Sequence, residues 1–135
     1  MNSPITAHPA LRDFMARRGI AADALRNGRL TLTIDGKYRV HLLPAPDGRL
    51  ALQAKVMTLP GEEGSHVAGQ AIERLLNLGA GMLREHASTL CFETKGQVLQ
   101  LQQSLASDIS GELLDAEVAE FTNALDFWAR TGKSL

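Results

Sequence analysis

The sequence predicts an α+β fold of the order α-β-β-β-α-β-β-α, in which helices pack on a twisted, antiparallel five-stranded sheet. Alternation of apolar and polar residues recurs in grouped segments, which is the period-2 pattern of half-buried strands. Short turn signals separate most of these segments, so neighbouring strands are expected to pair antiparallel. Three other segments place apolar residues at helical spacing. At 135 residues, the chain is expected to form a single domain over residues 1–135.

The N-terminal part predicts one helix followed by three strands. The helix is expected over residues 8–18, because Pro9 suits the first helical position and the next apolar residues have helical spacing, namely Leu11, Phe14 and Met15. Asp35-Gly36 is the dipeptide best suited to a two-residue type I′ turn, in which both positions need a positive φ. Strands are expected over residues 29–34, 37–42 and 49–57.

A second helix, a strand pair and a last helix follow. The second helix is expected from a cap at Ser65 to about residue 86, with Gly79 and Gly81 weakening its second half. Lys95-Gly96 supplies a turn between strands at residues 90–93 and 98–105. Ser110 is expected to cap the last helix and Gly132 to end it, with an apolar face made of Leu114, Val118, Phe121, Leu125 and Trp128.

Bulk composition narrows the classes of function. The chain carries 14 basic and 15 acidic residues with few aromatic ones, which argues against a nucleic-acid-binding surface. A single cysteine cannot form an intramolecular disulfide, so a reducing compartment is expected. The first residues lack the pattern of an export signal, and no apolar run has the length of a membrane span. We therefore expect a cytoplasmic protein.

Catalytic and metal-binding patterns are weak. Cys91 and His86 are the one pair that resembles a nucleophile and a base, but Cys91 falls inside a predicted strand, where a packed cysteine is the simpler interpretation. The four histidines are spread over separate elements without metal-ligand spacing. Gly79 and Gly81 lie within a helical pattern rather than between a strand and a helix, so a phosphate-binding loop is not predicted. We predict no metal site and no cofactor.

The residue patterns of two predicted strands fit either a structural or a binding role. Gln100 and Gln102 share one face of the strand at 98–105, which is either a solvated sheet face or a hydrogen-bonding surface for an extended peptide. Leu30, Leu32 and Ile34 are either core residues or side chains of an edge strand that is open to strand addition. The sequence leaves both alternatives open.

The order of these elements, together with the stretch STLCFETKGQVLQLQQSLASDIS at residues 88–110, resembles the class I type III secretion chaperones, the CesT/SycE-like family of bacterial effector chaperones. GRLTLTIDGKYRVHLL at residues 28–43 is similar to the first hairpin of that family. LREHASTLCFE at residues 83–93 is similar to the passage from its second helix into its fourth strand. The resemblance covers almost the whole chain, and it lies in the order and spacing of apolar patterns.

The resemblance implies a cytoplasmic bacterial homodimer without catalytic activity, linked to virulence. It implies binding to the N-terminal chaperone-binding region of a secreted effector, which is kept soluble and competent for the secretion ATPase. It places the dimer interface at Leu75, Leu78, Gly79, Met82, Leu90, Cys91 and Phe92. It places effector contacts at Leu11, Phe14, Met15, Leu30, Leu32, Ile34, Gln100 and Gln102. The alternatives are a small thiol-dependent enzyme that uses Cys91 and a small-ligand-binding α+β domain.

Overall fold

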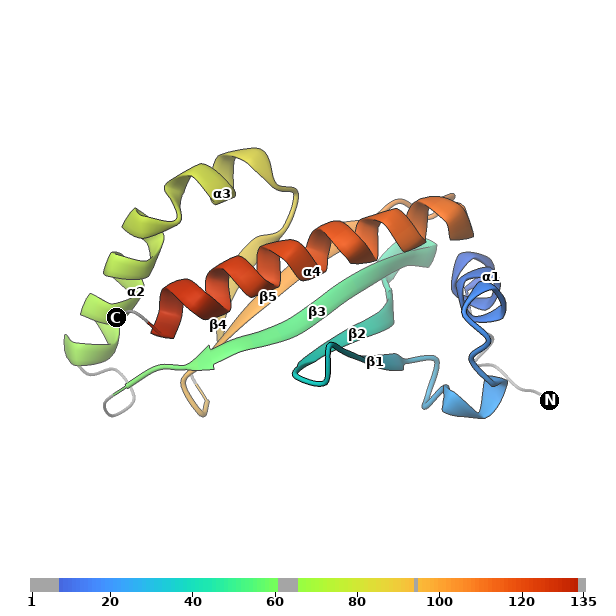
Figure 1. Ribbon diagram of the computed structural model, residues 1–135, viewed down its shortest axis with the longest axis horizontal. Helices are drawn as coiled ribbons and strands as arrows, with labels where there is room; N and C mark the ends of the chain where they lie inside the picture. Colours follow the sequence, from blue (N-terminus) through green and yellow to red (C-terminus); the bar gives the residue numbers. More distant parts are fainter. Residues whose placement is uncertain (1–7, 61–65, 94, 134–135) are drawn as a thin grey trace.

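A long helix crosses one face of a five-stranded antiparallel sheet, with a short helix at one end and a helical arm at the other (Figure 1). The computed structural model describes residues 8–60, 66–93 and 95–133, so the cap predicted at Ser65 lies outside the described residues. The helices are α1 (Pro9–Arg17), α2 (His66–Leu78), α3 (Ala80–Glu85) and α4 (Gly111–Lys133), with 3₁₀ turns at Ala22–Ala24 and Pro46–Gly48. The strands are β1 (Leu30–Ile34), β2 (Tyr38–Ala45), β3 (Arg49–Thr58), β4 (Thr89–Glu93) and β5 (Val98–Leu105). The predicted α+β class is confirmed.

The strand order β1-β2-β3-β5-β4 makes β1 and β4 the two edge strands. In the meander β1-β2-β3, the predicted hairpin turn joins β1 to β2, and there Asp35 and Gly36 have φ values of 55° and 68°. The second hairpin joins the sheet through β5, which pairs antiparallel with β3 over almost the whole length of both strands. Because β5 lies between β3 and β4, the last strand of the meander becomes the central strand.

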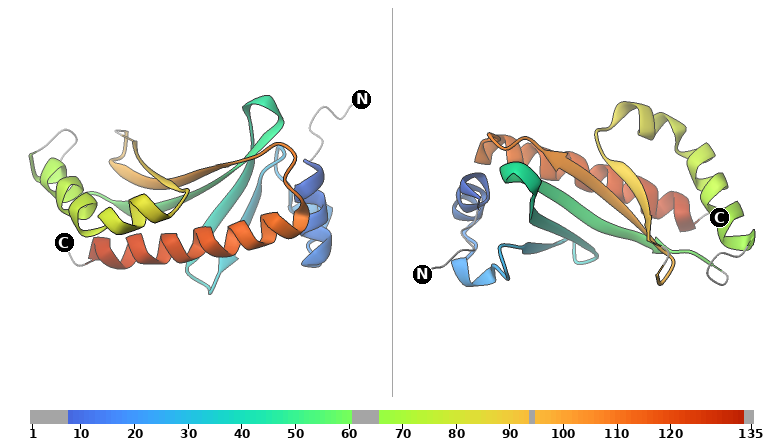
Figure 2. Two further views of the ribbon diagram at one scale, coloured as in Figure 1. Left: turned by 90° about the horizontal axis from the view of Figure 1, so that it is seen from above. Right: turned by 180° about the vertical axis from the view of Figure 1, so that it is seen from behind.

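The core lies between the sheet and α4. The apolar face predicted for the last helix is buried, from Leu114 to Trp128. It packs on the side chains that β2, β3 and β5 direct to one side of the sheet, among them Leu42, Leu52 and Leu101. Among the described residues, no helix crosses the opposite face of the sheet (Figure 2).

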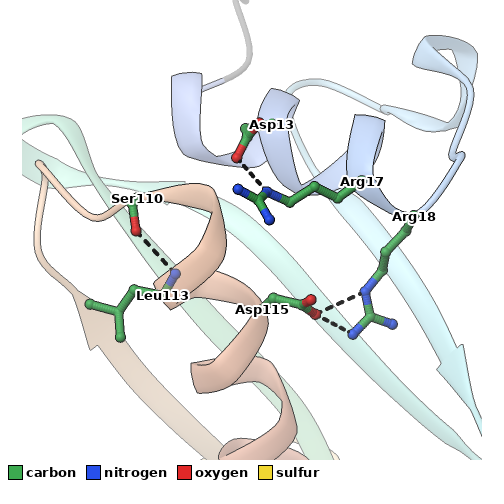
Figure 3. A network of polar contacts seen from close by, with 6 residues as sticks. All are labelled: Asp13, Arg17, Arg18, Ser110, Leu113 and Asp115. Atoms are coloured by element: carbon green, nitrogen blue, oxygen red, sulfur yellow. Dashed lines mark hydrogen bonds and ion pairs between the residues drawn. The ribbon is translucent and has the colours of Figure 1, made fainter.

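Polar contacts hold α1 against the first turns of α4 (Figure 3). The Arg18 guanidinium donates two hydrogen bonds to Oδ1 of Asp115, at 3.1 and 2.5 Å. Oγ of Ser110 accepts from the backbone N–H of Leu113 at 3.0 Å, which is the predicted N-cap of α4. The Arg18–Asp115 contact thus links the C-terminal end of α1 to α4.

The predicted second helix is broken at Gly79 into α2 and α3. A Cβ at this position would lie 2.1 Å from Cη2 and 2.3 Å from Cζ3 of Trp128. The glycine therefore lets the helical arm approach the indole ring at the C-terminal end of α4. Gly81 has no such neighbour within 4 Å in the part of the chain that the structure describes, so the two glycines that the sequence predicts to weaken this helix have different roles.

A hydrogen bond joins the start of β2 to α4. The Tyr38 hydroxyl donates to Oδ1 of Asp126, and the other oxygen of Asp126 contacts Nε of Arg130 at 2.9 Å. The hydrogen bond from Tyr38 lowers the pKa of Asp126, and the same bond raises the pKa of Tyr38. The bond therefore favours the ionised carboxylate together with the protonated phenol.

We expect Tyr38→Phe to lower stability at neutral pH and to have a smaller effect at both pH extremes. A lowered pKa means that Asp126 stabilises the fold above its ordinary value of 3.8, and this stability is lost as the pH falls. A raised pKa means that Tyr38 stabilises the fold below its ordinary value of 10.0, and this stability is lost as the pH rises through the raised value. Urea unfolding of both proteins across this range measures the difference, and a difference that does not change with pH would contradict the assignment.

Candidate protein-binding surfaces

An apolar groove lies beside α1, where the chain turns from the helix toward β1. Its volume is about 360 Å³, and it is lined by Arg12, Met15, Ala16, Ile20, Ala22 and Leu25. Ile20 and Leu25 are half-buried and rest on the core, so the groove is an outward continuation of the core. The segment that lines it then enters β1 through a turn in which Arg26 and Arg29 exchange backbone hydrogen bonds of 2.9 and 3.0 Å.

Edge strand β1 begins directly after this turn. Its side chains alternate, with Leu32 and Ile34 half-buried against the core and Thr31 and Thr33 exposed. β1 pairs only with β2 in the sheet, so its outer side has no neighbouring strand among the described residues. An edge of this kind presents unpaired N–H and C=O groups to which another extended chain can add.

Four of the effector-binding residues predicted from the sequence fill the core instead of a surface. Leu11 and Phe14 are completely buried, and Met15 and Leu30 are 4% and 1% exposed. The apolar stripe of α1 faces α4 and the sheet of the same chain, which leaves these side chains with almost no surface for a partner. For Leu30 this placement is the core alternative that the sequence left open, and the predicted contacts that remain on this side are Leu32, Ile34 and Met15, which lines the groove beside α1.

Gln100 and Gln102 belong to a polar ladder on the face of the sheet opposite α4. Oε1 of Gln100 accepts from Nε2 of Gln53 on β3 at 2.6 Å and from Nε2 of Gln102 at 3.4 Å. Nε2 of Gln100 donates to Glu93 on β4 at 3.4 Å. Because these amides are hydrogen-bonded to each other, the structure favours the solvated sheet face over a hydrogen-bonding surface for an extended peptide.

Cys91 and His86 do not form a nucleophile–base pair. The Cys91 thiol donates to Oε1 of Gln102 at 3.4 Å. The His86 ring bonds to Oγ of Ser88 at 2.7 Å and to the backbone oxygen of Glu120 at 3.1 Å. Within the described ranges, no cluster of three or more histidine, cysteine or acidic residues is placed to hold a metal ion. The geometry gives no support to the thiol-dependent enzyme that the sequence left as an alternative.

Four large apolar side chains of the helical arm and edge strand β4 are exposed. They are Leu76, Leu78, Leu83 and Phe92, of which Leu78 is 58% exposed. The expected interface residues Met82, Leu90 and Cys91 are half-buried, whereas Leu75 and Gly79 are buried within the chain. The predicted interface did not include Leu76 and Leu83, although both belong to the apolar helical period of this segment.

Sequence reasoning also missed the groove residues Ile20 and Leu25. Both follow Gly19, in a stretch without a regular period, and the one signal was that two large aliphatic residues stood in a segment otherwise expected to be a solvated loop.

Within the described residues, every helix is too short or too polar to cross a bilayer.

Among the described residues, each edge strand of the sheet lies near exposed or half-buried apolar side chains, which is an arrangement suited to binding another polypeptide. The fold is that of a solved type III secretion chaperone. The model of the Tir chaperone protein (CesT) family matches residues 9–129. This match spans most of the chain, which therefore belongs to the CesT family. The resemblance drawn from the sequence is confirmed, and the protein is an effector-binding chaperone of type III secretion. A comparison with curated proteins gave no match.

Solved structures share the fold. A chain of the ExsC–ExsE complex superposes with a TM-score of 0.65 at 24% identity, covering 90% of this chain and 89% of the other. A chain of the HopA1–SchA chaperone–effector complex gives 0.62 at 19% identity, with coverages of 90% and 91%. A chain of the complex between the Yersinia pestis type III secretion chaperone SycH and a fragment of YscM2 gives 0.63 at 19% identity, with coverages of 91% and 99%.

Proposed function

We propose that the chain binds the N-terminal chaperone-binding segment of a secreted effector in extended form, along the outer side of β1 and into the groove beside α1. The observation that carries this proposal is the direct passage of the groove-lining segment into an edge strand. An extended client strand can pair with the backbone of β1 while an apolar side chain near its end enters the groove. Two of the similar folds come from complexes of a chaperone with an effector or a stable protein fragment, which supports such a mode.

Binding in this form keeps apolar client residues away from water. A segment held as an extra strand cannot fold or aggregate, yet it is released without the unfolding of a packed domain. We propose that the secretion ATPase receives the client in this state. We also propose that residues 1–135 act as one domain in the bacterial cytoplasm and that the role requires no catalysis.

The test is co-expression of the chain with the N-terminal fragment of a candidate effector, such as one encoded beside it. We expect a fragment that is insoluble alone to become soluble and to co-purify with the chain. A version of the fragment without its N-terminal segment is the control, and it is expected to remain uncaptured. Failure of every candidate effector fragment to form a complex would contradict the proposal.

We further propose that the arm surface of Leu76, Leu78, Leu83 and Phe92 forms a homodimer interface. Large aliphatic and aromatic side chains this exposed, on a helix that leads into an edge strand, favour burial against a second chain. A second copy offers the same apolar surface, as a two-fold symmetric interface requires. The proposal retains Leu78, Met82, Leu90, Cys91 and Phe92 from the predicted interface.

We expect Leu78→Asp to convert the protein from a dimer to a monomer. The substitution places a charge on the most exposed member of the arm surface, and a buried unpaired carboxylate opposes association. The molar mass measured by light scattering after gel filtration should fall from twice the 14.6 kDa chain mass in the wild type to the mass of one chain in the variant. Asn77→Asp adds the same charge at the neighbouring exposed position and should remain dimeric. A wild-type protein that is monomeric at micromolar concentration would refute the interface.

A further inference from the structure

A pocket outside both surfaces lies where β5 ends and α4 begins. Its volume is about 520 Å³, and its lining includes Gln103, Leu105, Asp108, Ile109, Leu113 and Glu117. It is therefore built from the last residues of the inner strand β5, the following loop and the first two turns of α4, together with Ala87 before β4. These elements give the pocket a rigid frame.

Gln103 supplies the unusual feature of this pocket. It is 5% exposed, on the face of β5 that packs toward α4, and its Nε2 donates to Oε2 of Glu117 at 2.5 Å. Its Oε1 is buried and has no hydrogen-bond partner within the described part of the chain. Exchanging the amide oxygen and nitrogen does not remove the problem, because two acceptors would then face each other. Oε1 of Gln103 therefore lacks a hydrogen-bond donor among the described residues, and buried polar atoms are rarely left without a partner.

The charge of the pocket indicates which donor fits. Its two ionisable lining residues are Asp108 and Glu117, and no lysine, arginine or histidine lines it among the described residues. The positive end of α4 acts mainly within the first turn, where Glu112 stands, whereas Glu117 lies in the second turn. Leu113, which is 52% exposed, forms an apolar rim and points away from α1 (Figure 3).

We propose that this pocket takes an arginine side chain of the bound client segment. Arginine carries five N–H donors in a planar fork, so one guanidinium that pairs with the Glu117 carboxylate has further N–H groups to offer to the neighbouring end of the Gln103 side chain. The aliphatic part of the arginine lies along Leu113 and Ile109. The inference rests on the proposed function for the origin of the arginine, but the pocket itself can be tested without a client.

The first arm of the test titrates the isolated chain with acetyl-Leu-Arg-amide and with acetyl-Leu-citrulline-amide, followed by nuclear magnetic resonance. Citrulline has nearly the shape of arginine but no charge. We expect the arginine peptide alone to shift the side-chain amide signals of Gln103 and the backbone signal of Leu113. Equal shifts with both peptides, or no shift of these signals, would overturn the proposal.

Glu117→Gln is the informative variant. The introduced amide oxygen still accepts from Gln103, so the fold is retained while the charge is removed. We expect it to weaken binding of the arginine peptide by about tenfold. Glu120→Gln makes the same change one turn further along α4, at an exposed position outside the pocket, and should bind like the wild type. Equal weakening by both variants would show a general effect of charge and would overturn the site.

The second arm measures the affinity of a captured effector fragment for the same variants. A complex that Glu117→Gln weakens and Glu120→Gln does not supports the pocket as a client site. A complex that neither variant weakens refutes this inference and leaves the proposed function standing. Failure to capture any client refutes the proposed function, while the peptide titration still decides whether the pocket binds arginine.

Discussion

Replacing Gly79 with alanine is expected to destabilise the protein by about 2 kcal/mol, in the range for overpacked sites. The added Cβ would lie 2.1 and 2.3 Å from two atoms of the Trp128 ring, far inside van der Waals contact. Trp128 is 1% exposed and stacks edge-to-face with Phe127 at 5.3 Å, so the ring cannot move without repacking the end of α4. Urea unfolding followed by tryptophan fluorescence measures the loss.

Gly81→Ala is the matched control for this prediction. Gly81 lies inside α3, and a Cβ added there would meet no atom of the described residues within 4 Å, so alanine should fit without a clash. The higher helix propensity of alanine should raise stability by up to about 1 kcal/mol. Opposite signs for the two substitutions are therefore expected. A Gly79→Ala protein that is as stable as Gly81→Ala would contradict the packing of the arm on Trp128.

Ile20→Asp is expected to weaken client binding by about thirtyfold, or ~2 kcal/mol, as for an anchor residue in a binding groove. Ile20 is half-buried in the groove beside α1, and a carboxylate there would have to be desolvated when a client side chain enters. Isothermal titration with an effector fragment measures the change, and thermal unfolding checks that the fold is kept.

Ala21→Asp is the control for Ile20→Asp. It adds the same charge at the adjacent position, which is exposed and does not line the groove. Its affinity for the client should stay close to that of the wild type. A loss of affinity in Ala21→Asp as large as in Ile20→Asp would indicate a general electrostatic effect and would remove the groove from the client site.

Local patterns predicted the elements well, because each depends on neighbouring residues. The turn at Asp35-Gly36 and the apolar face of α4 follow from backbone preferences and helical spacing, and both are present. The order of the strands in the sheet could not be predicted from the sequence. The pairing of β5 with β3 joins segments far apart in the chain, so the sequence could not place β1 and β4 at the edges.

The binding surfaces were harder to predict because periodicity identifies an apolar face without identifying what covers it. Leu11 and Phe14 have the spacing of an interaction helix, yet α4 of the same chain buries them. Gly79 is a small residue of the kind that lets two helices approach closely at an interface, yet the side chain that it approaches is Trp128 of the same chain. Gln103 gave no sequence signal, since only the tertiary structure leaves its Oε1 buried without a donor among the described residues.

Hydrogen exchange of the chain, free and bound to an effector fragment, tests the central claim most directly. If a client adds as a strand to β1 and fills the groove beside α1, amides in residues 30–34 and 16–25 should exchange more slowly in the complex. The backbone of α4, already protected in the free protein, should change little. A stable complex that leaves both segments unprotected, or protects the arm of α2 and α3 in their place, would contradict the account.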